Sequence, residues 1–230
     1  MTALLVSPGE LGAAEVAVEG EPYRHLFRAA RLAVGDPLRV VDGAGRAREG
    51  RVIDVDRKRG RVALGEELPS LEPTLALELL VASPRPQRAS WLVEKATELG
   101  VVAVRFLTTE RSVRELGAGQ RGHLEKVARS AVEQCGRARC PEISGPHAWA
   151  ELPRLLGGFE SRLHLDFGHP PPIPGPGPRL ALLVGPEGGW TEAERRALLE
   201  LGNRPAGLGE RALRVETAAL AAASICLLRR

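Results

Sequence analysis

The sequence predicts an α/β protein in which a small β-rich domain precedes a larger domain built on a parallel sheet. Short β-like runs separated by turn signals fill residues 1–70, a pattern typical of a small barrel. A proline-flanked segment at 68–73 is a plausible linker. Beyond it, apolar strands alternate with amphipathic helices, which indicates a mostly parallel sheet with helices on both faces. We therefore expect domains at 1–70 and 71–230.

The first domain combines short strands with a local excess of positive charge. The strands are expected at 3–6, 15–18, 38–41, 46–55 and 61–64, with one helix at 23–32. Residues 24–61 carry eleven Lys and Arg against five Asp and Glu, although the whole chain has a formal net charge of only +3. Such asymmetry favours a surface that contacts nucleic acid, and a solvated surface with scattered arginines is the alternative.

The second domain follows a strand–helix rhythm. Its strands are expected at 75–82, 101–107, 162–167 and 180–184, and its helices at 87–99, 120–136, 149–156 and 216–228. Thr191 and Glu194 have capping-box spacing, which predicts the start of a further helix. Residues 168–178 include six prolines and are expected to form a stiff surface connection.

The polar residues exclude several classes of site. Cys135, Cys140 and Cys226 form neither a metal-binding pattern nor an obvious disulfide framework, and the five histidines are dispersed. We see no signal peptide and no apolar run long enough to cross a membrane. These features predict a cytoplasmic protein with no metal and no membrane partner.

The chemistry is expected in two loops of the second domain. The apolar run 180–184 leads directly into the sequence Gly-Pro-Glu-Gly-Gly at 185–189, and a second loop at 208–214 leads into a helix of small residues. Glycines after a buried strand let a ligand approach the main chain, and the carboxyl end of a strand is where α/β proteins bind ligands. Neither the Walker nor the dinucleotide-binding spacing is present. The loops therefore predict a main-chain-lined pocket suited to an adenine and an amino acid.

Five ordered motifs, together spanning nearly the whole chain, resemble those of the RsmE family. These motifs are residues 182–194 with 208–224, residues 88–101, residues 109–112, residues 131–137, and the segments 25–31, 34–36 and 41–43 of the first domain. Members of that family are S-adenosylmethionine-dependent methyltransferases of the SPOUT class that modify N3 of a uridine in small-subunit ribosomal RNA. Trp190 departs from the aliphatic residue, Ser or Thr that the family often has after its glycines.

The resemblance implies a fold, a cofactor and partners. It implies a trefoil-knotted SPOUT domain after a PUA-like β-barrel, a homodimer, and 16S rRNA, within the small ribosomal subunit, as substrate. Three loops, at 165–168, 185–189 and 208–217, would enclose S-adenosylmethionine. The residues expected to bind it are Leu165, Leu183, Val184, Gly185, Glu187, Gly188, Leu208, Gly209, Leu213 and Thr217.

Methyl transfer to uridine N3 needs a group that accepts the N3 proton and a positive charge beside the carbonyl oxygens of uracil. The candidates for the charge are Arg111, Arg137 and Arg214, and those for the base are Glu133 and Glu216. Each has a structural alternative. Arg111 could pair with Glu110 or Glu115, Glu133 with Arg129 one helical turn away, and Glu216 could complement the start of the last helix.

Arginines expected to bind RNA are Arg24, Arg28, Arg31 and Arg88. Two other functions stay open from the sequence. The chain could be a SPOUT methyltransferase acting on another RNA, or a non-catalytic RNA-binding factor in ribosome assembly.

Overall fold

A computed structural model describes residues 3–112, 116–117 and 119–228. The chain divides into two compact units. The first runs to Glu72 and also includes Arg129–Cys140, and the second comprises Pro73–Ala128 and Pro141 onwards. The return of 129–140 to the first unit was not expected from the sequence, because the helical pattern of this stretch is continuous with the residues before it. The division into functional domains at 70 and 71 stays a prediction.

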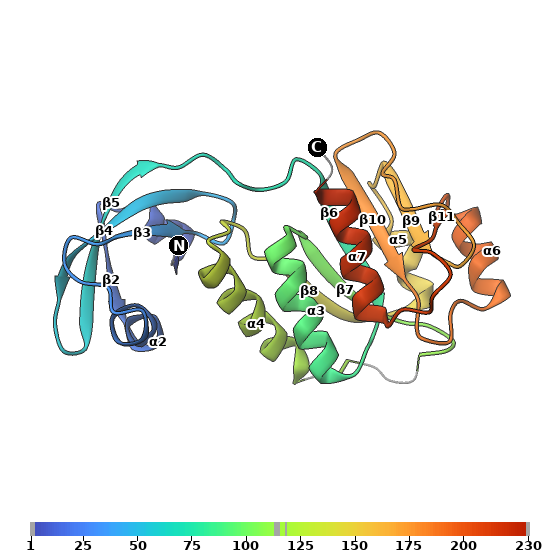
Figure 1. Cartoon of the computed structure of the whole chain (residues 1–230), viewed down its shortest axis with the longest axis horizontal. Helices are drawn as coiled ribbons and strands as arrows, with labels where there is room; N and C mark the ends of the chain where they lie inside the picture. The colour runs from blue at the N-terminus through green and yellow to red at the C-terminus, as the bar shows by residue number, and fades with distance from the viewer. Residues whose placement is uncertain (1–2, 113–115, 118, 229–230) are drawn as a thin grey trace. The chain divides into compact units, whose positions relative to one another are not determined.

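The first unit is a five-stranded sheet (Figure 1). Its strands lie in the order β1-β3-β4-β5-β2, with β1 parallel to β3 and the other pairs antiparallel. The bounds of these strands are β1 Ala3–Leu5, β2 Glu15–Glu19, β3 Pro37–Val41, β4 Ala47–Val55 and β5 Arg59–Glu67. The β-rich prediction for this part of the chain is confirmed.

A short helical segment packs into the apolar core of this sheet. It comprises α2 (Gly20–Tyr23) and the π-helix η1 (Arg24–Ala29), and α1 (Pro8–Leu11) precedes it. The ring of Phe27 lies so close to Gly60 that a Cβ at this position would collide with it. A glycine at this position of β5 therefore lets η1 approach the sheet.

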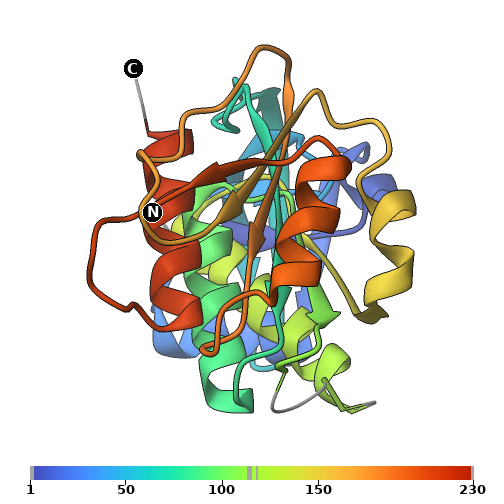
Figure 2. The same ribbon diagram turned by 90° about the vertical axis from the view of Figure 1, so that its right-hand side faces the viewer.

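The second unit contains a six-stranded sheet in the order β11-β9-β10-β6-β7-β8, with every neighbouring pair parallel. Its strands are β6 Ala76–Ala82, β7 Ala103–Thr108, β8 Glu142–Ala148, β9 Ser161–Leu165, β10 Arg179–Val184 and β11 Arg204–Ala206. Its helices are α3 Pro86–Leu99, η2 Trp149–Glu151, α5 Leu152–Leu155, α6 Glu192–Glu200 and α7 Val215–Leu227, while α4 (Gln120–Cys135) begins in this unit and continues into the first. Figure 2 shows α3 and α7 on one side of the sheet and α5 and α6 on the other. The predicted parallel α/β architecture is confirmed.

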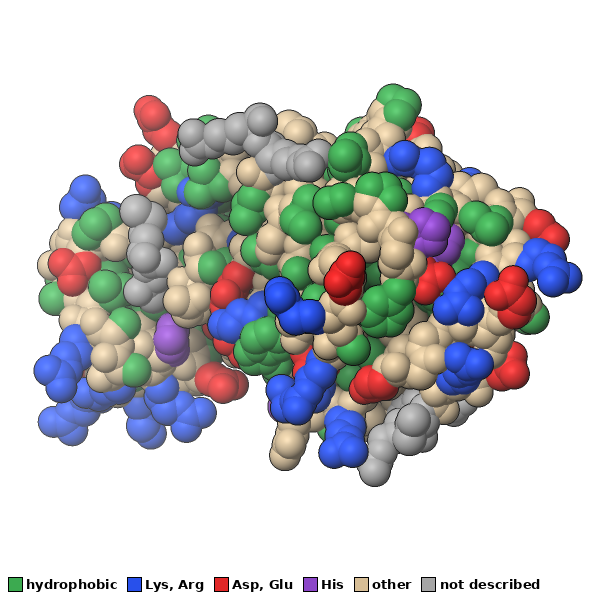
Figure 3. Space-filling view, turned by 45° about the vertical axis from the view of Figure 1, so that its right-hand side comes forward, with side chains coloured by type: hydrophobic (Ala, Val, Ile, Leu, Met, Phe, Trp, Pro, Cys, Tyr) green, Lys and Arg blue, Asp and Glu red, His purple; other side chains and the backbone are tan. Residues whose placement is uncertain are grey.

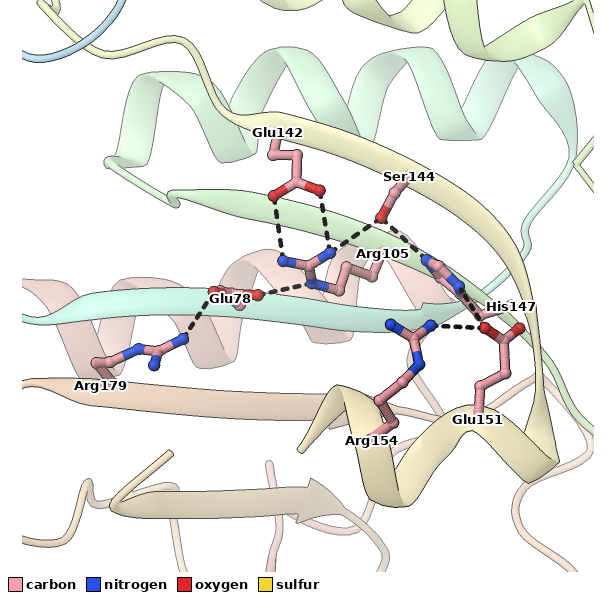
Figure 4. A network of polar contacts seen from close by, with 8 residues as sticks. All are labelled: Glu78, Arg105, Glu142, Ser144, His147, Glu151, Arg154 and Arg179. Carbon is pink, nitrogen blue, oxygen red and sulfur yellow. Dashed lines mark hydrogen bonds and ion pairs between the residues drawn. The ribbon is translucent and has the colours of Figure 1, made fainter. Parts of the chain in front are cut away.

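A polar network ties four neighbouring strands of this sheet together, namely β10, β6, β7 and β8 (Figure 4). Arg105 of β7 donates to Glu78 of β6 at 2.7 Å and to both carboxylate oxygens of Glu142 of β8 at 3.1 and 3.2 Å. Arg179, the first residue of β10, lies 3.6 Å from the other oxygen of Glu78. Because Arg179 begins its strand, this network lies towards the amino ends of the parallel strands. The pocket described next lies at the opposite ends of the strands, the carboxyl ends.

Candidate functional site

An open pocket lies where β9 and β10 end. It is formed by three segments, at 165–167, 184–190 and 208–218. The carboxyl ends of parallel strands are where α/β proteins usually bind small molecules. The residues that line it are Leu165, Asp166, Phe167, Val184, Gly185, Pro186, Glu187, Gly189, Trp190, Leu208, Gly209, Arg211, Ala212, Leu213, Val215 and Ala218.

Trp190 forms the floor under the glycine loop. Its ring is almost fully buried, and its Nε1 donates to the carbonyl oxygen of Leu165 at 2.9 Å. A Cβ at Gly185 would lie 2.9 Å from the ring, so the main chain rests directly on the indole. One side chain thereby fixes the end of β9 and the loop after β10. Trp190 differs from the residue that the RsmE family often has at this position, and here its ring supports the main chain that lines the pocket.

The proline-rich segment crosses over the last part of the chain. Gly207 donates its N–H to the carbonyl oxygen of Pro170 at 2.7 Å, and a Cβ at Gly207 would collide with the main chain of His169. Near the end of α7, the thiol of Cys226 lies 3.7 Å from the carbonyl oxygen of Pro172. The loop that enters the pocket and the helix that follows it are therefore both held beneath this segment.

Charged groups beside the pocket have well-defined partners. Burial opposes the ionisation of Asp166, but hydrogen bonds from Arg195 and from the N–H of Phe167 outweigh it and lower the pKa of this carboxyl. Asp166 therefore carries a negative charge at the pocket wall, with Arg195 2.6 Å away. His164, in β9 just before Asp166, is buried, and burial lowers its pKa to about 4, so this imidazole is neutral near pH 7.

Seven of the ten residues expected to bind the cofactor line the pocket, namely Leu165, Val184, Gly185, Glu187, Leu208, Gly209 and Leu213. The other three lie close by in sequence. Leu183 is buried in the apolar core, Gly188 packs against Arg111, and Thr217 is exposed in the first turn of α7. The other lining residues divide into two sets. Those inside the three predicted loops, although not singled out there, are Asp166, Phe167, Pro186, Gly189, Arg211, Ala212 and Val215, and those just outside these loops are Trp190 and Ala218.

Three of the five catalytic candidates lie in the second unit, near the pocket segments. Arg111 donates through Nη1 to the carbonyl oxygen of Gly188 at 2.7 Å. Arg214 is exposed at the N-cap of α7, between two pocket-lining residues. Glu216 is buried, and its Oε1 lies 3.4 Å from Arg88, which was expected to bind RNA. Glu115, a suggested partner of Arg111, lies outside the described residues.

The other two catalytic candidates belong to the first unit. Arg137 is buried and donates through Nε to Glu72 at 2.7 Å, and the second oxygen of Glu72 accepts the N–H groups of Ala138 and Arg139. Burial raises the pKa of Glu133, which makes this carboxylate a better proton acceptor than an exposed one. Within that unit, the contacts of Arg137 brace the segment that follows α4.

Basic side chains gather over the first unit, as Figure 3 shows. Arg24 and Arg28 lie in the π-helix, and Arg31 follows it with a φ of 58°. The guanidinium of Arg28 lies 5.6 Å from the centre of the Tyr23 ring and donates to the carbonyl oxygen of Arg57 at 3.0 Å. These contacts order Arg28 while leaving the residue exposed.

Neither a metal-binding cluster nor a membrane-spanning helix is found in the part of the chain that the structure describes. Among these residues, no three His, Cys, Asp or Glu side chains are grouped closely enough to hold a metal ion. None of the described helices combines the length and the apolar character needed to cross a lipid bilayer.

Comparison with known proteins places the chain in a family. Residues 71–227 match the profile described as an RNA methyltransferase domain, and residues 18–64 match that of an RNA methyltransferase PUA domain. The chain belongs to this RNA methyltransferase family. The predicted fold class, a SPOUT methyltransferase domain after a PUA-like domain, is thereby confirmed.

Several family members resemble the chain over most of its length. Ribosomal RNA small subunit methyltransferase E from Mycobacterium bovis is 30% identical, over 89% of this chain and 83% of the relative. The protein of the same name from Synechocystis is 27% identical, over 94% of this chain and 73% of the relative. The crystal structure of ribosomal RNA small subunit methyltransferase E from Neisseria gonorrhoeae bound to S-adenosyl methionine is 25% identical, with a TM-score of 0.84 over 98% of this chain and 96% of that chain.

Proposed function

We propose that this chain transfers a methyl group from S-adenosylmethionine to N3 of a uridine in 16S rRNA of the small ribosomal subunit. The observation that carries the proposal is the pocket at the carboxyl ends of β9 and β10, built by the loops that the sequence marks for the cofactor. Relatives that share the whole architecture are named as small-subunit rRNA methyltransferases, and one of them is bound to S-adenosyl methionine.

The pocket has the chemistry that this cofactor requires. Aliphatic side chains at Leu165, Leu208 and Leu213 offer an apolar surface to an adenine, while the main chain of the glycine loop is open to hydrogen bonding. Two carboxylates, Asp166 and Glu187, also line the pocket. Negative charge is the right complement to a cofactor that carries a sulfonium and an ammonium group.

The chain's own residues would align the acceptor and remove a proton. When bound, the cofactor supplies a methyl group that its sulfonium already activates, so positioning carries most of the catalysis. Arg214 is best placed to stabilise negative charge on uracil, because it is exposed between Leu213 and Val215 of the pocket wall. Arg111 and Arg137 remain the other candidates for this role. Glu133 and Glu216 are the candidates that would accept the N3 proton.

The RNA and the second subunit would be held by other surfaces. We assign Arg24, Arg28 and Arg31 to contacts with RNA phosphates, and residues 1–70 to an RNA-binding domain in front of a methyltransferase domain at 71–230. Arg88, half exposed, is the fourth residue that we assign to RNA contacts, and its ion pair with Glu216 also supports a role in orienting the start of α7. The hydrogen bonds of Gly207 and Cys226 to the proline-rich segment support a trefoil knot, in which the end of the chain would pass behind that segment. A homodimer in the cytoplasm, where small subunits are assembled, completes the proposal.

Two measurements test this function. Isothermal titration with S-adenosylmethionine should show one saturable site per chain, and absence of binding would refute an enzyme of this kind. Purified protein and methyl-labelled cofactor should then label the 16S rRNA of small subunits from cells that lack the protein. Labelling of a transfer RNA or another RNA instead would favour the alternative substrate, while binding of RNA without any transfer would favour the assembly factor.

A further inference from the structure

Glu194 makes two different hydrogen-bonded contacts with its two carboxylate oxygens. Its side chain is buried, although it lies in the first turn of α6. Oε2 accepts the N–H of Thr191 at 2.8 Å, and the hydroxyl of Thr191 accepts the N–H of Glu194 at 3.2 Å, which completes the predicted capping box. Oε1 accepts the N–H of Glu110 at 3.0 Å, from the loop that follows β7. This second contact joins segments that are 84 residues apart in the chain.

The loop held by Glu194 is a compact turn. The N–H and the hydroxyl of Thr109 both lie 2.9 Å from the hydroxyl oxygen of Ser112. Between these two residues, Arg111 reaches out of the turn and donates to the carbonyl oxygen of Gly188 at 2.7 Å. The aliphatic part of Arg111 also packs against Gly188. The turn therefore holds the glycine loop from one side.

Together, these contacts hold the loop at 185–190 at two places, its middle and its end. Glu194 fixes the end of that loop directly, through the main chain of Thr191. It also fixes the turn at 109–112, whose Arg111 binds the middle of the same loop at Gly188. Gly188 and Thr191, where the two routes end, adjoin the pocket-lining residues 187, 189 and 190. A change at Glu194 should therefore reach the pocket without any contact between Glu194 and a ligand.

We propose that Glu194 is a positioning residue for cofactor binding, which it supports by placing the turn at 109–112 and, through Arg111, the glycine loop. The proposal rests on the function stated above. A capping box alone accepts either Glu or Gln. Two N–H donors on two different oxygens require a carboxylate, because a Gln side chain has one acceptor oxygen and would turn its own N–H₂ towards the second donor.

The test is Glu194→Gln, with Glu10→Gln as the matched control. Glu10 closes a capping box of the same kind with Ser7, at 2.8 and 3.3 Å, but in an exposed position and in the first unit. Loss of one net hydrogen bond corresponds to about a 3- to 10-fold change in an equilibrium constant. We expect Glu194→Gln to weaken S-adenosylmethionine binding by about this factor, and Glu10→Gln to leave the affinity unchanged.

A double-mutant cycle separates this role from simple capping of α6. If Glu194 acts through Arg111, then Arg111→Ala combined with Glu194→Gln should bind S-adenosylmethionine about as well as Arg111→Ala alone. If Glu194 only caps the helix, the two losses of affinity should multiply, and that result would overturn the proposal. If Glu194→Gln proves too unstable to purify, Arg111→Ala tests the same set of contacts. This variant leaves the capping box of α6 intact and should still weaken S-adenosylmethionine binding.

A second readout does not need the cofactor. In the protein alone, hydrogen exchange of the Glu110 amide should be faster in Glu194→Gln than in the wild type, and unchanged in Glu10→Gln. Failure of the wild type to bind S-adenosylmethionine would refute the proposed function. If the wild type binds and Glu194→Gln matches it in affinity and in exchange at Glu110, only the role of Glu194 is refuted.

Discussion

Replacing Gly185 by alanine should disturb the pocket from below. The added Cβ would lie 2.9, 3.1 and 3.3 Å from three ring atoms of Trp190, closer than carbon atoms pack without a shift. The ring has little freedom to move, since it is fully buried, bonded to the carbonyl oxygen of Leu165 and 5.9 Å from the centre of the Trp149 ring. The strain therefore has to be shared between the indole and the loop.

The expected loss of unfolding free energy in Gly185→Ala follows from two opposing effects. Overpacking of a core by one methyl group typically costs about 1–3 kcal/mol. Alanine also restricts the unfolded chain, which returns roughly 0.4–1 kcal/mol where the main chain accepts it. Gly185 is not among the glycines with a positive φ, so this second effect applies. We expect Gly185→Ala to lower the free energy of unfolding by about 1–2 kcal/mol and to weaken S-adenosylmethionine binding.

Denaturant unfolding and isothermal titration measure these two effects. Gly188→Ala is the control for stability, because its Cβ would meet Arg111 at an ordinary 3.4 Å and its φ is not positive either. Its free energy of unfolding should stay within about 0.5 kcal/mol of the wild type. If Gly185→Ala is as stable as the wild type and binds the cofactor equally well, Trp190 is not the rigid floor described here.

Three further changes test other parts of the account. His164 takes up a proton near pH 6.5 in the unfolded chain but only near pH 4 in the folded protein. The wild type should therefore lose about 3 kcal/mol of unfolding free energy as the pH falls through this range, and His164→Leu should remove that loss. Equal slopes of unfolding free energy against pH in the two proteins would contradict this prediction. Glu72→Ala takes the carboxylate from the buried Arg137 and should cost about 3 kcal/mol in denaturant unfolding, whereas a cost below 1 kcal/mol would show that the pair is dispensable. Replacing Arg28 and Arg31 together by alanine should weaken RNA binding and reduce its salt slope by up to about 2, and unchanged affinity would refute RNA docking by the first unit.

The sequence predicted those elements whose local pattern is strong. The buried run at 180–184 gave the central strand β10, and the Thr191–Glu194 spacing gave the start of α6. Strand β8 was not predicted, because it lies at the sheet edge and contains Gly145 and Pro146, which weaken a strand pattern. Strand β11 has only three residues, too few to show a period.

The helix expected at 23–32 shows a different limit. Leu26 and Phe27 are buried as a helical pattern requires, but the segment is a short α-helix followed by a π-helix, and it ends at Ala29. The period of apolar residues does not distinguish these two helix types over so few turns. The close approach of Phe27 to Gly60, which the fold requires, depends on residues far apart in the chain.

The lining of the pocket was more predictable from the sequence than the contacts between its side chains. Glycines after a buried strand mark a loop that a ligand can approach, which pointed to Gly185, and the resemblance to the RsmE family pointed to Gly209; both line the pocket. No local pattern indicates that Trp190 lies beneath Gly185 or that Arg88 reaches Glu216. Such contacts arise from the tertiary fold, and the roles of the catalytic candidates depend on them.

The proposed reaction places a methyl group on one base of the small-subunit RNA. The most direct measurement is mass spectrometry of 16S rRNA from cells with and without this protein. We expect a fragment containing N3-methyluridine in cells with the protein and the same fragment lighter by one methyl group in cells without it, and restoring the protein should restore the methyl group. Identical 16S rRNA in both cells would contradict it.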